Sequence, residues 1–439
     1  MYRHLNILLA KDSALALKIC CITKIQSHLS EFRRFFNSVI ICIFTSALRN
    51  LCCGKLEVIL PSGTRAIVFD KQVHTGCDVV LQMNNFGIFW KSIRRGTVGF
   101  AASYIDGDFE VNNLANIFRF FLLNKKQLGN AGRGFFKTRL PDKLFHRSRV
   151  NTQQGSKRNI AAHYDLGNAF YNEWLDDTMT YSSALFSGNQ SLEQAQQAKY
   201  QRIADLVGVA PGKSLLEIGC GWGGMSEMAA KHDSIVTAIT VSRQQLEYVR
   251  ERISRAGLKK KVDVRFEDYR CCRGTFDSIT SIEMIEAVGE ENWDLYFSTL
   301  AARLKQEGRI VIQAITIDPE LFKTYRKKPD FIQRFIFPGG MLPTERVLAK
   351  YAKAAGLKII HQEMFGQSYT RTLKEWRMRF LDSWPRLKNM GFDEKFRRMW
   401  LYYLTYCEVG FEQGTVDVGI YVLKKTTSAM SSSESCSSL

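Results

Sequence analysis

Apolar and polar positions along residues 160–425 predict strands and helices in alternation. Short apolar runs with the length of buried strands are separated by longer stretches of helical period. The seven predicted strands are residues 214–218, 235–239, 262–266, 276–282, 309–315, 356–364 and 416–423. The helices predicted between them include residues 225–231, 244–255 and 293–304. This alternation predicts a doubly wound α/β sheet, whose ligands bind beyond the carboxyl ends of the strands.

Two long segments interrupt this alternation. Residues 319–346 follow the strand 309–315, and residues 372–412 form a long helical stretch before the last strand. We expect both insertions to cover a substrate.

Residues 51–130 have a different pattern, which predicts a small α+β domain. Strands at residues 55–60 and 65–69 flank a Pro-Ser-Gly turn and form a hairpin. A third strand, at residues 77–83, precedes a helical stretch from residue 88 and an apolar helix at residues 114–123. This domain shows no catalytic constellation.

The remaining segments are extensions and a linker. Residues 1–50 are apolar and basic, and fit equally an amphipathic membrane-contact element or an extension without a fixed role. Their longest apolar run, 35–48, is shorter than the ~18–20 residues of a membrane span, so a buried or interfacial helix is favoured. Residues 131–159 are a linker dense in bases and aromatics, and the serine-rich residues 426–439 are expected to be disordered.

Charge and cysteine usage narrow the class of protein. The net charge of +18 implies a partner with a negative surface. No nucleic-acid reading module is recognisable, so an anionic phospholipid surface is favoured over nucleic acid, and each base in the linker contributes ~1 kcal/mol there. The cysteines lack C-x-x-C pairs, which argues against a zinc site and for a reducing compartment.

A glycine-rich loop follows the first strand of the sheet. Glu217 ends that strand, and Gly219, Gly221 and Gly223 let the backbone turn sharply and approach a ligand closely. The helix that follows presents its N-terminal amides to the same place. The leading acid separates this pattern from the dinucleotide fingerprint and favours S-adenosylmethionine, whose positive charge tolerates a carboxylate.

Polar residues also follow the second and third strands. Thr240, Ser242 and Gln245 could bind the ribose hydroxyls of the same ligand, although Thr240 and Ser242 could instead cap the next helix. Glu267 and Asp268 could accept a hydrogen bond from its adenine amino group.

Glu283 and Glu286 follow the fourth strand, three positions apart. Solvated acids are the usual interpretation of such a pair. Because the carboxyl end of a strand lies at the pocket mouth in this architecture, we favour a functional role, with Glu286 ranked above Glu283.

Seven motifs in this order resemble those of cyclopropane-fatty-acyl-phospholipid synthases. The resemblance runs from about residue 157 to residue 425, and residues 99–108 also resemble the N-terminal domain of the larger members. The motifs are residues 162–168, 180–186, 216–224, 240–245, 283–289, 335–340 and 365–369.

The resemblance implies a seven-stranded methyltransferase sheet and a reaction. S-adenosylmethionine gives its methyl group to the cis double bond of an unsaturated phospholipid acyl chain, and a base then removes a proton to close a cyclopropane ring. In the family this base is a bicarbonate ion. The resemblance further implies a cytoplasmic protein, peripheral at the inner face of a membrane, and is compatible with a homodimer.

The resemblance also assigns the site residues. Those placed around S-adenosylmethionine are Tyr181, Ser182, Glu217, Gly219, Cys220, Gly221, Trp222, Gly223, Thr240, Ser242, Gln245, Glu267 and Asp268. Those placed around bicarbonate are Ser183, Glu286, Gln313, Ile315 through its backbone, and Tyr369. Tyr369 is also the aromatic side chain that we expect to face a carbocation.

Three positions depart from the family pattern. Ser183 stands where many members have a cysteine, and Ala287 and Gln313 stand where they have histidines. Ser183 and Gln313 can still hydrogen-bond an anion, but a methyl-branched or unsaturated product becomes an alternative to a cyclopropane. A small-amine N-methyltransferase is a further alternative, although the long helical cover and the basic linker favour a lipid.

Overall fold

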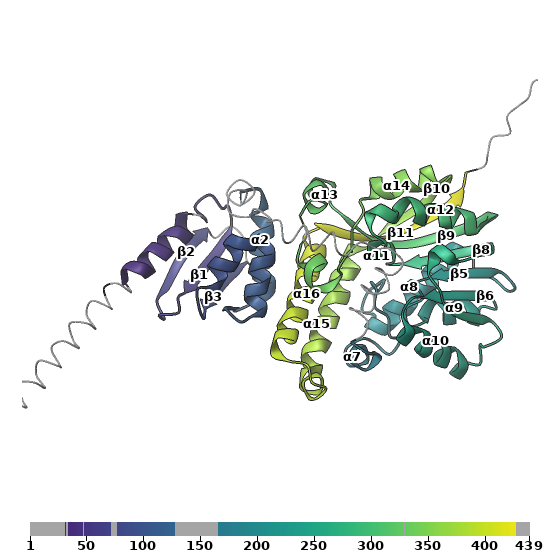
Figure 1. Ribbon diagram of the computed structural model, residues 1–439, viewed down its shortest axis with the longest axis horizontal. Helices are drawn as coiled ribbons and strands as arrows, with labels where there is room; N and C mark the ends of the chain where they lie inside the picture. The colour runs from purple at the N-terminus through teal and green to yellow at the C-terminus, as the bar shows by residue number, and fades with distance from the viewer. Residues whose placement is uncertain are drawn as a thin grey trace, which may run out of the picture. The chain divides into compact units, whose positions relative to one another are not determined.

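Strands β5 to β11 form the seven-stranded sheet that the alternation predicts (Figure 1). The computed structural model describes residues 31, 34–46, 48–71, 77–127, 166–328 and 330–426. The sheet order is β10-β11-β9-β8-β5-β6-β7, and β11 alone runs antiparallel to its neighbours. The strands are β5 (Ser214–Ile218), β6 (Ile235–Thr240), β7 (Val262–Phe266), β8 (Phe276–Ile282), β9 (Leu304–Ile317), β10 (Leu357–Met364) and β11 (Val416–Lys425).

Helices cover both faces of this sheet (Figure 1). One face packs against α8 (Leu192–Val207), α9 (Gly224–Lys231) and α10 (Arg243–Arg255). The other packs against α11 (Ile285–Val288), α12 (Trp293–Arg303) and α14 (Glu345–Ala354). Successive residues of β5 point to opposite faces, so Leu215 belongs to the first layer and Leu216 to the second. Burial on both faces explains why the strands are continuous apolar runs.

The order of the strands creates a crevice at their carboxyl ends. β5 and β8 are neighbours, but the chain leaves β5 for α9 on one face and β8 for α11 on the other. Ligands of such sheets bind where the connections diverge in this way.

Asp277 ties the start of β5 to β8 and so fixes this pair of strands. Its Oδ2 atom accepts hydrogen bonds from the backbone N–H of Ser214 (2.9 Å), from Ser214 Oγ (2.7 Å) and from Lys305 Nζ (2.9 Å). These donors hold the pKa of Asp277 well below its usual range.

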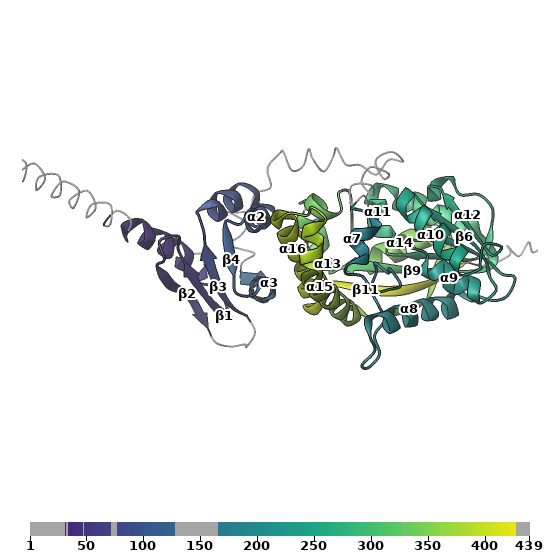
Figure 2. The same cartoon turned by 90° about the horizontal axis from the view of Figure 1, so that it is seen from below.

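The two predicted insertions form the remaining helices beyond the crevice. The first contains α13 (Pro319–Tyr325) and a short π-helix, η3 (Ile332–Ile336). The second is a pair of long helices, α15 (Gly366–Asn389) and α16 (Glu394–Glu412), which lie side by side in both views (Figures 1 and 2). An ion pair between Arg377 Nε and Glu408 Oε2 (2.6 Å) joins them.

Some predicted boundaries are wrong. α15 begins at Gly366 rather than at residue 372, and Asp393 starts α16 by capping it, so the predicted single stretch is two helices. β9 begins at Leu304, within the segment assigned to the preceding helix. The short elements α7 (Asn168–Asn172), η1 (Tyr269–Cys271) and η2 (Glu290–Asn292) are too brief to give a periodic signal.

The N-terminal part contains the predicted α+β elements. Strands β1 (Gly54–Ile59), β2 (Arg65–Lys71), β3 (Asp78–Met83) and β4 (Phe109–Val111) form a sheet in the order β2-β1-β3-β4, accompanied by α2 (Gly87–Ile105) and α3 (Leu114–Leu123). The pattern did not predict β4, which has only three residues.

Contacts divide the chain into two units, residues 1–90 with 107–135, and residues 91–106 with 136–439. α2 thus spans this division, and the domain bounds expected from the sequence stay a prediction. Most of the extension 1–50, the basic linker 131–159 and the tail lie outside the described residues. Within the described part of the chain, no helix is long and apolar enough to cross a membrane.

We predict that Asp277→Asn destabilises the sheet in a pH-dependent way. Because the pKa of this carboxyl is lowered by folding, its stabilisation is present above the unfolded value of about 3.9 and is lost as the pH falls. At neutral pH the variant should lose about 1.5–3 kcal/mol of unfolding free energy, and the loss should shrink below about pH 4. Thermal or urea unfolding of the full chain measures both.

The matched control is Asp263→Asn. Asp263 lies on the edge strand β7 and pairs with Arg265 in solvent, where ion pairs contribute little. It should change stability by no more than about 0.5 kcal/mol. An equal effect of the two substitutions would contradict the role given to Asp277.

Candidate active site

A cavity of about 120 Å³ occupies the crevice at the carboxyl ends of β5, β6, β7 and β8. Its lining contains every residue assigned to S-adenosylmethionine except Gly223 and Ser242. The assigned residues that line it are Tyr181, Ser182, Glu217, Gly219, Cys220, Gly221, Trp222, Thr240, Gln245, Glu267 and Asp268.

The glycine loop is held against the neighbouring strand. The backbone N–H groups of Gly219 and Cys220 both donate to the carbonyl oxygen of Ile239 (3.0 and 3.1 Å). Gly219 has a φ of 75°, and a Cβ there would lie 2.4 Å from Met284 Cγ. Gly223 has a φ of 85° and is the N-cap of α9, the helix that follows the loop. Glycine is therefore required for the shape of the loop.

Glu217 is buried at the end of β5 and lines the cavity. Ser226 Oγ donates a hydrogen bond to its Oε2 atom. Burial raises the pKa of Glu217 to about 7, although the Ser226 hydrogen bond and the charges of Lys199 and Arg252 act in the opposite direction. A bound cation would further favour the ionised form of this carboxyl.

The residues after β6 divide between two roles. Thr240 Oγ1 donates to Gln245 Oε1 (2.8 Å), and both residues line the cavity. Ser242 Oγ instead accepts from the backbone N–H of Gln245 (3.4 Å) as the N-cap of α10. For Ser242 the capping interpretation describes the structure, because a side chain that caps the helix is directed to its first turn.

The two acids after β7, Glu267 and Asp268, differ in how far their carboxylates are already engaged by other side chains. Asp268 receives Arg270 Nε on one oxygen (2.8 Å) and an Arg270 terminal nitrogen on the other (2.7 Å), and it caps η1. Its carboxylate is therefore already engaged on both oxygens. Glu267 lines the cavity as well, and its side chain is 23% exposed.

Aromatic rings surround Tyr181 at the side of the cavity nearest α15 and α16. Its ring centroid lies 5.4 Å from that of Tyr171 and 5.2 Å from that of Trp376. The hydroxyl groups of Tyr181 and Tyr403 are hydrogen-bonded at 2.9 Å. The ring centroid of Trp222 lies 5.0 Å from that of Tyr171.

Glu283 brings together three of the residues assigned to the anion pocket. Its Oε1 atom accepts from the backbone N–H of Ser183 (2.8 Å) and from Gln313 Nε2 (2.8 Å). Its Oε2 atom accepts from the hydroxyl group of Tyr369 (2.7 Å). Glu283 also lines the cavity, so its carboxylate faces the same space as Glu217.

The second acid, Glu286, has a different hydrogen-bond partner. Its Oε1 atom accepts from the backbone N–H of Ile315 (2.5 Å), and its buried Oε2 atom has no hydrogen-bond partner among the residues that the structure describes. Burial and the charge of Glu283 raise the pKa of Glu286 to about 8. Glu283 lines the cavity and Glu286 does not, and the ranking of Glu286 above Glu283 stays a prediction.

Lys199 is a buried cation that the sequence analysis missed. Its Nζ atom donates to Ser182 Oγ (2.7 Å) and lies 4.1 Å from the centroid of the Tyr200 ring. Burial lowers the pKa of Lys199 to about 7, against the attraction of nearby Glu283, Asp176 and Glu217. A signal was present, because Lys199 follows Ala195 by one helical turn and shares the buried face of α8.

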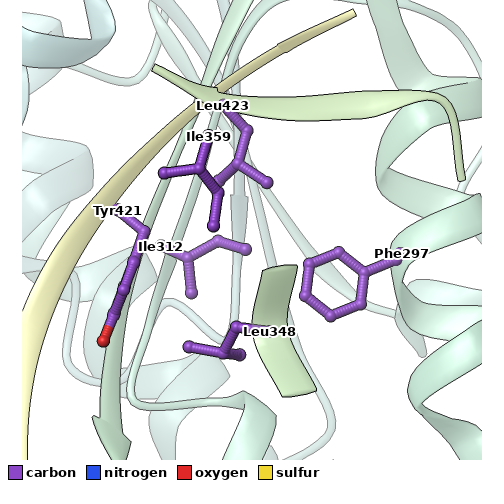
Figure 3. Close-up of a pocket in the computed structure, with 6 residues that line it drawn as sticks. All are labelled: Phe297, Ile312, Leu348, Ile359, Tyr421 and Leu423. Atoms are coloured by element: carbon purple, nitrogen blue, oxygen red, sulfur yellow. The ribbon is translucent and has the colours of Figure 1, made fainter. Parts of the chain in front are cut away.

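A second, apolar gap lies between the sheet and the layer of α12 and α14 (Figure 3). It is lined by Phe297, Ile312, Leu348, Ile359, Tyr421 and Leu423 and has no room for a water molecule. This gap is a packing defect of the core.

Comparisons with known proteins agree with this geometry. Residues 151–420 match the family model of mycolic acid cyclopropane synthetase. A tuberculostearic acid methyltransferase of Mycobacterium tuberculosis is 36% identical, with coverage of 74% of this chain and 78% of that protein. The cyclopropane-fatty-acyl-phospholipid synthase of Escherichia coli is 34% identical, with coverage of 75% and 84% respectively.

Solved structures extend the likeness to three dimensions. Mycolic acid cyclopropane synthase CmaA1, solved with SAH and CTAB, has a TM-score of 0.58 and 29% identity over 61% of this chain and 98% of its own. Coclaurine N-methyltransferase also has a TM-score of 0.58, over 75% of this chain and 99% of its own, but at 18% identity it shows the fold alone. The crevice, the glycine loop and these matches lead to one conclusion: the chain belongs to the mycolic acid cyclopropane synthetase family of S-adenosylmethionine-dependent methyltransferases.

Proposed function

We propose that this protein transfers a one-carbon unit from S-adenosylmethionine to the cis double bond of an unsaturated phospholipid acyl chain and forms a cyclopropane fatty acid. The observation that carries the proposal is the buried group of Glu283, Glu286 and Tyr369 beside the cofactor cavity. A buried carboxyl pair whose members have different hydrogen-bond donors suits a reaction in which a proton is removed after methyl transfer.

The surroundings suit the same chemistry. An alkene is a weak nucleophile, so much of the rate must come from alignment with the methyl group in a fixed, closed site. The carbocation that follows methyl transfer needs surroundings without water and is stabilised by aromatic faces. Tyr181, Tyr369 and Trp376 supply such faces, and Tyr369 and Trp376 are both buried.

A methyl-branched fatty acid is the second candidate product. Gln313 and Ser183 replace the histidine and cysteine expected from the family pattern, which changes how the proton acceptor is held. The relative from M. tuberculosis that is described as a tuberculostearic acid methyltransferase also supports this alternative. Both products start from the same cofactor, lipid and carbocation. Loss of a proton other than the one that closes the ring gives an unsaturated, methyl- or methylene-branched chain, and a saturated methyl branch would need a further hydride donor.

The proposal includes contact with a membrane surface, because phospholipid acyl chains are reached there. We propose a peripheral protein at the cytoplasmic face that binds anionic headgroups. The net charge of +18 supports this, since basic residues near an anionic surface contribute about 1 kcal/mol each.

Gly219→Ala should abolish cofactor binding. The added Cβ would lie 2.4 Å from Met284 Cγ, in a loop that lines the cavity. We expect the affinity for S-adenosylhomocysteine, measured by titration calorimetry, to fall by at least about tenfold. The control is Gly212→Ala, which has a similar φ of 73° but nothing within 4 Å of the new Cβ. Equal affinities of the two variants would contradict the placement of the cofactor.

Lipid analysis tests the proposed reaction directly. Cells that express the protein and receive methionine labelled in its methyl group should contain labelled fatty acids one methylene heavier than the unsaturated parents. A cyclopropane resists mild hydrogenation, whereas a methylene branch does not, so the same sample separates the two products. Glu286→Ala should remove the label. Unlabelled and unchanged fatty acids with the unsubstituted protein would refute the proposed function.

Vesicle sedimentation tests the proposed membrane contact. The full chain should sediment with phosphatidylglycerol vesicles at low salt and much less with phosphatidylcholine vesicles. Added salt should release it, because screening shortens electrostatic attraction to about 8 Å at physiological ionic strength. Binding that is indifferent to headgroup charge and to salt would contradict the electrostatic contact.

A further inference from the structure

Glu283 has a backbone conformation that is uncommon for a residue with a side chain. Its φ is 49°, in the left-handed region, directly after the end of β8. Its backbone N–H donates to the carbonyl oxygen of Gln313 on the adjacent strand β9 (2.8 Å), which holds the turn in place. Such backbone strain persists only where the surroundings fix it, and it occurs preferentially at functional sites.

This conformation directs the Glu283 carboxylate at donors from three separate segments. They are the backbone N–H of Ser183, the side-chain amide of Gln313 on β9 and the hydroxyl group of Tyr369 on α15, all within 2.8 Å. Three hydrogen bonds to one buried carboxylate fix both its position and its orientation.

A bicarbonate ion does not fit this arrangement. Ser183, Gln313 and Tyr369 direct donors at Glu283, and the backbone N–H of Ile315 donates to Glu286. The residues assigned to bicarbonate thus already bind the chain's own carboxyl groups. A further anion would lie beside Glu283 and Glu286 and be repelled while either is ionised.

The two carboxyl groups differ in the interactions that oppose the rise of their pKa. Burial raises the pKa of both, but the hydrogen bonds from Ser183, Tyr369 and Gln313 and the charge of Lys199 oppose the rise for Glu283. For Glu286, the charge of Glu283 adds to the rise, and its pKa reaches about 8. The hydrogen-bond donors therefore favour the ionised form more strongly at Glu283 than at Glu286.

We propose that the Glu283 carboxylate is the general base of the reaction, in the place that the family pattern gives to bicarbonate. The inference rests on the proposed function. In the first step the alkene π pair forms a new C–CH3 bond to the methyl group of S-adenosylmethionine. The C–S bond breaks and leaves its electrons on sulfur. The other alkene carbon becomes a cation. Glu283 then takes a proton from the new methyl group, and the freed C–H pair closes the ring.

The test uses the purified full chain, methyl-labelled S-adenosylmethionine and vesicles of unsaturated phospholipid in buffer depleted of carbon dioxide. The unsubstituted protein should keep its rate without added bicarbonate. Glu283→Gln should lower kcat by at least about 100-fold, the usual contribution of a positioned base, while its affinity for S-adenosylhomocysteine changes little. Retained affinity shows that the variant is folded.

Glu283→Asp and the pH profile distinguish a base from a structural role. The shorter carboxylate should recover part of the rate that the amide loses. In the unsubstituted protein, kcat should fall as the pH falls and Glu283 becomes protonated, and Glu283→Gln should lack this dependence. The groups that face Glu283 and shape the profile are Lys199, Glu286 and Tyr369.

Three results would overturn the assignment. The first is a several-fold stimulation when bicarbonate is added to the unsubstituted protein. The second is a kcat of Glu283→Gln within about threefold of that of the unsubstituted protein. The third is a hydroxylated lipid as the main product, which would mean that water captures the cation. If the unsubstituted protein transfers no label to lipid, the proposed function itself fails. If label transfer depends on added bicarbonate, the assignment of Glu283 as the base is wrong but the proposed function is not.

Discussion

The burial of two neighbouring carboxyl groups, Glu283 and Glu286, sets the conditions for the rest of the site. A buried charge is costly unless hydrogen bonds replace its lost hydration, and two adjacent carboxylates repel each other. The structure satisfies both constraints by giving Glu283 three donors and leaving Glu286 with a single backbone donor. Those donors come from β9, α15 and the loop before α8, so the site exists only when the sheet and the helical pair are assembled.

The helical pair α15 and α16 belongs to the site as much as the sheet does. The loop at residues 183–186 is joined to α15 by two hydrogen bonds, from the backbone N–H of Ala184 to Thr372 Oγ1 (3.1 Å) and from that of Phe186 to Ser368 Oγ (3.1 Å). The ion pair of Arg377 and Glu408 then joins α15 to α16. This connection positions Tyr369 on α15 against Glu283, to which its hydroxyl group donates a hydrogen bond (2.7 Å).

The site has two parts: the residues assigned to the cofactor, and the buried acids with their hydrogen-bond donors. The two parts differ in how closely they follow the family pattern. The glycine loop, Glu217 and the residues after β6 line the cavity almost as the resemblance implies. Two of the departures, Ser183 and Gln313, instead donate hydrogen bonds to Glu283, and the third, Ala287, lines the cavity. Gln313 donates to Glu283 through a neutral amide, so it holds the carboxylate without adding a charge or a proton of its own.

The sequence by itself determined the seven strands, the glycine loop and the family, because periodicity, glycine spacing and motif order are signals carried by neighbouring residues. It did not single out Lys199, and it could not show how the side chains of Glu283 and Glu286 are held. Both gaps have the same physical reason. The direction of the Glu283 side chain depends on a left-handed φ of 49°, and the surroundings of Lys199 depend on acids contributed by distant segments. Which carboxyl group faces the cavity, and which donors hold it, was therefore decided only by the tertiary structure.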